Sequence, residues 1–216
     1  MRRLLEPRHL TWSLPVGVAI AAANLPALRL FVSPGALAWF GGMLALVCVV
    51  MWQAHLAWTP AALLARECWR DRTFGYVVGA VVLLAVVAAF TVDPWMQRRL
   101  PEFLPADRYA ALVGLPGAMF FKTLFVFVTP YAFVSRLTAR PAWARAAVVL
   151  TGQLILVLKG YHLDGALLGG LVLVAAVKTW LLSWCYERYG YVGLAVLCGL
   201  LYARFLLLPE QPGVMP

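Results

Sequence analysis

The chain has 216 residues, of which 63% are hydrophobic and only 12% are charged, and its mean hydropathy is +0.84. Because soluble domains carry roughly 25% charged residues, this composition excludes a soluble globular protein and predicts a polytopic membrane protein. The net charge of +9 does not indicate nucleic-acid binding here, because the basic residues lie in short loops between apolar segments.

Long apolar runs predict about seven membrane-spanning helices within one domain, residues 1–216. The runs do not alternate apolar with polar residues, which excludes a membrane β-barrel and leaves an all-α bundle. The first run follows a basic flank but lacks a convincing cleavage site, so we expect a retained helix rather than a signal peptide. The expected spans are residues 10–32, 35–58, 74–92, 109–134, 144–158, 165–184 and 191–208.

Two connections between these spans have features of their own. Thr59 and Pro60 are typical of a helix start, and charged residues at spacings of three and four follow them, which predicts a short interfacial helix. The connection over 93–108 is polar and contains Pro and aromatic residues, which indicates an interfacial segment. A re-entrant piece over 93–112 is the alternative.

The distribution of Lys and Arg between alternate loops predicts the orientation. Ten basic residues fall on one side and five on the other, which places the N-terminus in the cytoplasm and, with seven spans, the C-terminus outside. We therefore expect a multi-pass protein of the cytoplasmic (inner) membrane of a bacterium, in contact with membrane lipids. The ten are Arg2, Arg3, Arg8, Arg66, Arg70, Arg72, Arg136, Arg140, Arg145 and Arg188, and the five are Arg29, Arg98, Arg99, Arg108 and Lys159.

Ionisable residues in or beside the spans are the candidates for chemistry. Lys122 lies near the middle of the fourth span, where inserting a lysine costs about 2.5–3.5 kcal/mol, so it either faces the bundle interior or a cavity, or snorkels past the kink at Pro116. His162 has Lys159 and Asp164 nearby at a span boundary and could act as a base, a ligand or a proton relay. The alternative for His162 is a local hydrogen bond that fixes a turn.

Other polar or small residues in the spans favour structural roles. Lys178 is expected to snorkel, and Gln153 and His55 are expected to form interhelical hydrogen bonds. Gly165 and Gly169 form a GxxxG pattern, which predicts close packing of the sixth span against a neighbour.

The cysteines and histidines do not form a recognisable ligand set. The four cysteines (Cys48, Cys68, Cys185 and Cys198) contain no CxxC and no metal-type pairing with the three histidines, so the sequence predicts neither a metal site nor a disulfide framework. We expect no cofactor, although His9, His55 or His162 could in principle ligate a haem or a chlorin. The nine Trp lie mostly at span ends and fit an interfacial belt.

The last third of the chain contains two short polar segments, each of which precedes an apolar span. Leu158-Lys-Gly-Tyr-His162 precedes a span, and Tyr186-Glu187-Arg188-Tyr189-Gly190 precedes the last one, which carries Cys198 and Tyr202. This arrangement over about 110–208 resembles the CPBP family of CAAX-protease and bacteriocin-processing intramembrane proteins. That resemblance implies a glutamate pair near Pro130–Arg136, a histidine at His162, and His and Asn or Asp where Cys198 and Tyr202 stand.

The glutamates are replaced, apparently by Phe133 and Val134. Peptide hydrolysis in the family is understood to need a carboxylate that activates water, with His and Asn stabilising charge. The resemblance therefore implies a degenerate relative that lacks the catalytic glutamates. We favour a protein without enzymatic activity over an enzyme. Its degenerate family positions are Phe133, Val134, His162, Cys198 and Tyr202.

Three functional hypotheses follow. The first is an inactive CPBP-like accessory, assembly or scaffolding subunit of a membrane complex with protein partners. The second is an active intramembrane hydrolase that uses Lys122, His162 and Asp164 as catalytic residues. The third is a cofactor-binding subunit of an electron-transfer or light-harvesting complex with an axial histidine.

Overall fold

The computed structural model describes residues 7–59 and 67–208, and all regular structure in these two ranges is helical. Six of the helical segments are long and apolar enough to cross a membrane. The composition predicted a multi-pass helical membrane protein, and the length and hydropathy of these six helices agree with that prediction.

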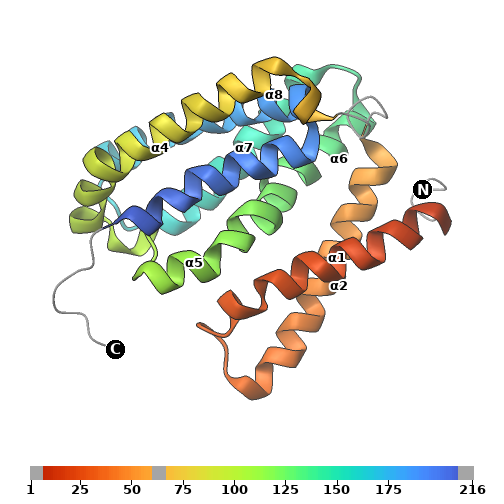
Figure 1. Ribbon diagram of the computed structural model, residues 1–216, viewed down its shortest axis with the longest axis horizontal. Helices are drawn as coiled ribbons and strands as arrows, with labels where there is room; N and C mark the ends of the chain where they lie inside the picture. The colour runs from red at the N-terminus through yellow and green to blue at the C-terminus, as the bar shows by residue number, and fades with distance from the viewer. Residues whose placement is uncertain (1–6, 60–66, 209–216) are drawn as a thin grey trace.

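The first two helices, α1 (Pro7–Leu28) and α2 (Pro34–Trp58), form a hairpin at the side of the remaining helices (Figure 1). A Cβ atom on Gly17 would lie 2.6 Å from the backbone of Val49, so only glycine permits this close approach. Ser13 donates a buried hydrogen bond of 2.7 Å from Oγ to Oε1 of Gln53 on α2. The hairpin contacts the rest of the bundle through α5 and α6, described below.

The third long helix, α4 (Arg72–Arg99), is longer than the sequence indicated. The polar segment from Asp93 was expected to leave the helix, but the helix continues through Pro94 to Arg99. Helices in membranes tolerate proline where neighbouring groups compensate, and Asp93 is fully buried against Arg204. Residues 100–107, which include the short 3₁₀ turn η3 (Pro101–Phe103), separate α4 from the next span, so the interfacial connection is shorter than expected.

The fourth span was expected to break at Pro116 and Pro130, but Arg108–Leu137 is one continuous helix whose turns change from α to π between the two prolines. It consists of α5 (Arg108–Pro116), two π-helical segments, η4 (Gly117–Phe121) and η5 (Thr123–Val128), and α6 (Thr129–Leu137). Asp107 caps the start of α5 by accepting a hydrogen bond from the backbone N–H of Ala110. Four side chains of η5 belong to the largest hydrophobic core, namely Leu124, Val126, Phe127 and Val128, and Leu124 and Val128 are completely buried.

The last two helices are α7 (Pro141–Gly160) and α8 (Gly165–Ala203), and α8 reverses direction at Gly190. Gly190 has φ 71° and ψ −170°, a combination that is essentially restricted to glycine. The first limb, residues 165–189, and the second limb, residues 191–203, run in opposite directions (Figure 1). In a straight helix Lys178 and Cys198 would lie about 30 Å apart, yet they interact electrostatically. A straight segment over Gly165–Leu207 would also be about 65 Å long, twice the membrane core.

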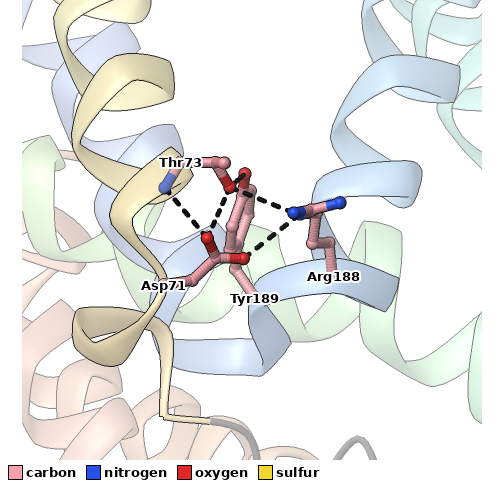
Figure 2. Close-up of polar contacts among 4 residues, drawn as sticks. All are labelled: Asp71, Thr73, Arg188 and Tyr189. Carbon is pink, nitrogen blue, oxygen red and sulfur yellow. Dashed lines mark hydrogen bonds and ion pairs between the residues drawn. The ribbon is translucent and has the colours of Figure 1, made fainter.

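A polar cluster holds the reversal of α8 against the start of α4 (Figure 2). Asp71 caps α4 by accepting a bond of 2.9 Å from the backbone N–H of Thr73, and it forms an ion pair of 3.2 Å with Nε of Arg188. The hydroxyl of Tyr189 lies 3.1 Å from Oγ1 of Thr73. Residues directly before Gly190 are thus fixed to the first turn of another helix.

Two expectations about local structure have different outcomes. The short interfacial helix was expected over residues that lie mostly outside the described ranges; its described end shows a 3₁₀ turn, η2 (Cys68–Arg70), and an exposed Glu67–Arg70 ion pair of 2.8 Å. The GxxxG prediction is wrong, because nothing lies within 4 Å of a Cβ placed on Gly165 or Gly169. These glycines do not face a neighbouring helix in this structure.

Candidate functional site

The positions that resemble the family's catalytic set do not converge. His162 is exposed in the connection between α7 and α8, whereas Phe133 and Val134 lie on α6, just before α7 begins. The 20 residues of α7, about 30 Å of helix, separate them. His162 instead contacts the ring of Tyr161, with centroids 5.7 Å apart.

Cys198 and Tyr202 lie on the second limb of α8 and have different surroundings. The thiol of Cys198 is hydrogen-bonded to the side chain of Thr123, inside the bundle. Tyr202 packs on Phe205, and its hydroxyl lies against Gly114 of α5. Neither side chain completes a site with His162.

The carboxylates that could have activated a water molecule near His162 have other partners. Asp164 caps α8 by accepting hydrogen bonds from the backbone N–H groups of Ala166 and Leu167, at 2.8 and 3.3 Å. Glu187 is part of the α8 helix, not of a loop as expected, and lies at the far end of the first limb from His162. Glu67 forms its ion pair with Arg70.

Glu187 belongs instead to a polar network near the Gly190 end of the bundle. Its Oε1 accepts a hydrogen bond of 3.0 Å from the hydroxyl of Tyr131 and one of 3.0 Å from Nε of Arg145. Tyr131 in turn packs edge-on against Tyr186, with ring centroids 5.1 Å apart. The network therefore joins α6, α7 and α8.

His55 connects this network to α2. Its Nδ1 lies 2.8 Å from Oγ1 of Thr59 and 3.3 Å from the hydroxyl of Tyr186. The side chain is only 3% exposed, and the rings of Trp52, Tyr186 and Tyr191 surround it. The expected interhelical hydrogen bond of His55 is confirmed by the contact between α2 and α8.

Lys122 and Lys178 lie near each other at the middle of their spans, which is unusual for two charged residues of the same sign. Lys122 is the single residue between the two π-helical segments, a type of distortion that occurs frequently at functional sites. Lys178 lies midway along the first limb of α8 and is close enough to Lys122 for the two ammonium groups to repel each other. Both residues are exposed.

Neither of these ammonium groups has an ion pair or a hydrogen bond within residues 7–59 and 67–208. Asp93 accepts a bond of 2.7 Å from Nε of Arg204 to its Oδ2. Arg204 also interacts electrostatically with Lys178, so three cations face one carboxylate that is already paired. Chemically, this arrangement can bind an anion.

The sequence singled out Lys122 because a lysine is costly to insert into a membrane, but it could not show that Lys178 lies beside it. Lys122 and Lys178 are 56 residues apart and on different helices, so no spacing within one helix could connect them. Asp93 was missed because it precedes a proline and other polar residues, a pattern typical of a loop. Asp164 lies about 20 Å along α8 from Lys178, the neighbour of Lys122, so the structure does not bring Asp164 together with the two lysines.

An apolar cavity of about 400 Å³ lies between α1 and the second limb of α8. Its walls include Trp12, Ile20, Phe120 and Tyr191. The hydroxyl of Tyr191 is already used in a hydrogen bond of 3.3 Å to the carbonyl oxygen of Phe120. The cavity therefore offers shape and apolar surface but no polar group that would orient a reactant.

In the part of the chain that the structure describes, no group of three or more His, Cys, Asp or Glu side chains could hold a metal ion. Comparison with protein-family models, with curated proteins and with solved structures found no match for this chain. The site must therefore be interpreted from its own chemistry.

Proposed function

We propose that this protein acts by binding another membrane protein, as an accessory, assembly or scaffolding subunit of a membrane complex, and that it does not hydrolyse peptides. We place it in the cytoplasmic membrane of a bacterium with its N-terminus inside, and we regard residues 110–208 as a degenerate CPBP-like part. The observation that carries the proposal is the exposed pair of mid-span ammonium groups, Lys122 and Lys178, which have no carboxylate partner in the described chain.

The physical reason is the cost of such charges in a bilayer. Inserting one lysine at the centre of a span costs about 2.5–3.5 kcal/mol, and ionisable residues at that depth normally pair with another group. Arg204 and Arg145 each have an acid partner within the chain, Asp93 and Glu187 respectively. The two lysines lack one, which supports a partner outside the chain.

The arrangement around His162 supports the second half of the proposal. A histidine-assisted hydrolysis requires a carboxylate or an equivalent base within about 3 Å, or one water molecule away. Asp164 serves as the cap of α8, and Glu187 is the ion-pair partner of Arg145 at the opposite end of the first limb from His162.

The proposal can be tested on the full-length protein in its own membrane. After cross-linking in intact cells and extraction in mild detergent, we expect the chain in a complex larger than its 23.8 kDa monomer, with a partner in fixed stoichiometry. We also expect no cleavage of membrane-embedded reporter peptides by the purified protein. A protein that stays monomeric after cross-linking, or cleavage that is lost in His162→Ala, would overturn the proposal.

A further inference from the structure

The two central lysines lie on a surface that combines charge with exposed apolar side chains. On α8, Val174 and Leu181 are one helical turn from Lys178 and are 69% and 57% exposed. On the π-helical segment η5, Phe125 is three residues after Lys122 and is 40% exposed. Charged groups surrounded by exposed apolar side chains are typical of a site for another helix and not of a lipid-facing surface alone.

The depth of this surface limits what can bind there. Lys122 lies near the centre of the helical segment Arg108–Leu137, and Lys178 lies about 20 Å along its helix from Gly165. Lipid phosphates lie at the edges of a hydrocarbon core that is about 30 Å thick, so they are far from both ammonium groups. The carboxylate of a side chain in the middle of a transmembrane helix lies at the right depth.

The charge balance sets the chemistry of that group. Lys122 and Lys178 repel each other, and Asp93 does not neutralise them, because its single negative charge is paired with the guanidinium of Arg204. One further carboxylate placed between the two ammonium groups removes the repulsion and satisfies hydrogen-bond donors of both lysines.

We propose that Lys122 and Lys178 together bind a single aspartate or glutamate carried at the centre of a transmembrane helix of a partner protein. This inference rests on the proposed function as a binding subunit and names the contact through which binding occurs. The partner helix packs on the exposed side chains of Phe125, Val174 and Leu181, while its carboxylate lies between the two ammonium groups.

The test uses a designed host helix, because the natural partner is not identified. A transmembrane peptide of Leu and Ala with one central Asp, and a second peptide with Asn in its place, are reconstituted with the full-length protein in phosphatidylcholine vesicles. Association is measured by energy transfer between fluorophores on the peptide and the protein. We expect the Asp peptide to associate about tenfold more tightly than the Asn peptide, since ion pairing adds to helix packing.

The protein variants connect this preference to the site. In Lys122→Leu/Lys178→Leu we expect the preference for Asp to disappear, and in Lys122→Arg/Lys178→Arg to persist. Lys159→Leu/Arg140→Leu is the matched control, because these residues lie at the two ends of α7, Lys159 over the ring of Phe103, and their loss changes the net charge by the same two units. The double leucine variant removes charges from the membrane interior, so it should melt no lower than the wild type.

Three results would overturn the inference: equal association of the Asp and Asn peptides, a preference that survives the double leucine substitution, or loss of the preference when phosphatidylglycerol is added, which would identify an anionic lipid as the occupant. The proposed function fails by a different result. Peptide cleavage that depends on His162 would contradict it even if the Asp peptide bound at the lysines as expected.

Discussion

Charged side chains in this protein fall into two groups, those with partners in the chain and those without. The Arg204–Asp93 and Arg145–Glu187 pairs connect segments that are far apart in sequence, and their partial burial makes each charge dependent on the other. The Arg188–Asp71 pair is more exposed and gains its strength from the hydrogen bonds that Thr73 adds. Lys122 and Lys178 have no such partner in the described chain, which is why we assign them a role between molecules.

The cluster around Asp71 makes a pH-dependent prediction. Hydrogen bonds from the side chain and backbone N–H of Thr73, helped by Arg188, hold the pKa of Asp71 below its ordinary value of 3.8. A carboxylate with a lowered pKa in the folded state contributes stability above its unfolded pKa, and that contribution is lost as the pH falls through the folded pKa. We expect Asp71→Asn to melt below the wild type at pH 7 and this difference to shrink below about pH 4.

Thermal unfolding in detergent, followed by circular dichroism between pH 7 and pH 3, measures this difference. Glu67→Gln is the control, because it removes an exposed ion pair that contributes little stability. A difference between Asp71→Asn and the wild type that is the same at pH 7 and at pH 3 would contradict the prediction.

The helices of this bundle are defined largely by the residues at their starts, kinks and reversals. Asp71, Asp107 and Asp164 each cap a helix by accepting hydrogen bonds from backbone N–H groups of the first turn. The fourth span contains Pro116 and Pro130 but continues through two π-helical segments. The reversal in α8 depends on one residue, Gly190, whose φ of 71° distinguishes it from every other described residue.

Gly190 therefore offers a sharp test at the level of the helix. An alanine at φ 71° and ψ −170° is strained by about 1–3 kcal/mol, so Gly190→Ala should lower the free energy of unfolding by that amount. Gly169→Ala is the matched control on the same helix, since nothing lies within 4 Å of the added Cβ, and we expect a change within about 0.5 kcal/mol.

Denaturant titration in mixed micelles gives both free energies of unfolding. Equal stability of Gly190→Ala and Gly169→Ala would mean that the reversal is not held in the strained conformation. Destabilisation by Gly169→Ala alone would indicate that Gly169 packs closely against a neighbour, as the GxxxG pattern predicted.

At the scale of the whole molecule, the reversal decides the topology. If both limbs of α8 cross the membrane, the chain crosses seven times and its ends lie on opposite sides; if α8 crosses once, six crossings leave both ends on one side. The excess of Lys and Arg in alternate loops predicts an N-terminus in the cytoplasm. The C-terminus then lies outside only when the second limb is a span.

We expect seven crossings, and labelling of introduced cysteines checks this. In a chain whose native cysteines are replaced, a cysteine at His162 or Pro216 should react with an impermeant maleimide on intact cells. A cysteine at Thr138 should react only after the cells are permeabilised. Labelling at His162 but not at Pro216 would support six crossings instead.

The sequence alone determined the class of the protein and the approximate position of each span, because the cost of exposing polar backbone to lipid fixes the length and composition of a membrane helix locally. Its prediction of breaks at Pro116 and Pro130 was wrong, since the fourth span continues past both prolines as one helix. The same local reasoning failed at Asp93, whose burial depends on Arg204, a residue 111 positions away. It also failed at Gly165 and Gly169, because the spacing of small residues does not determine whether another helix lies beside them.

Only the tertiary structure decided which polar groups meet. It brought Lys122 to Lys178, His55 to Tyr186 and Glu187 to Arg145, and it left His162 apart from all of them. Each of these contacts joins different helices, and their formation depends on how the helices pack and on the reversal at Gly190. Periodicity within one helix fixes which side chains share a face, but the partner of that face is chosen by packing between helices.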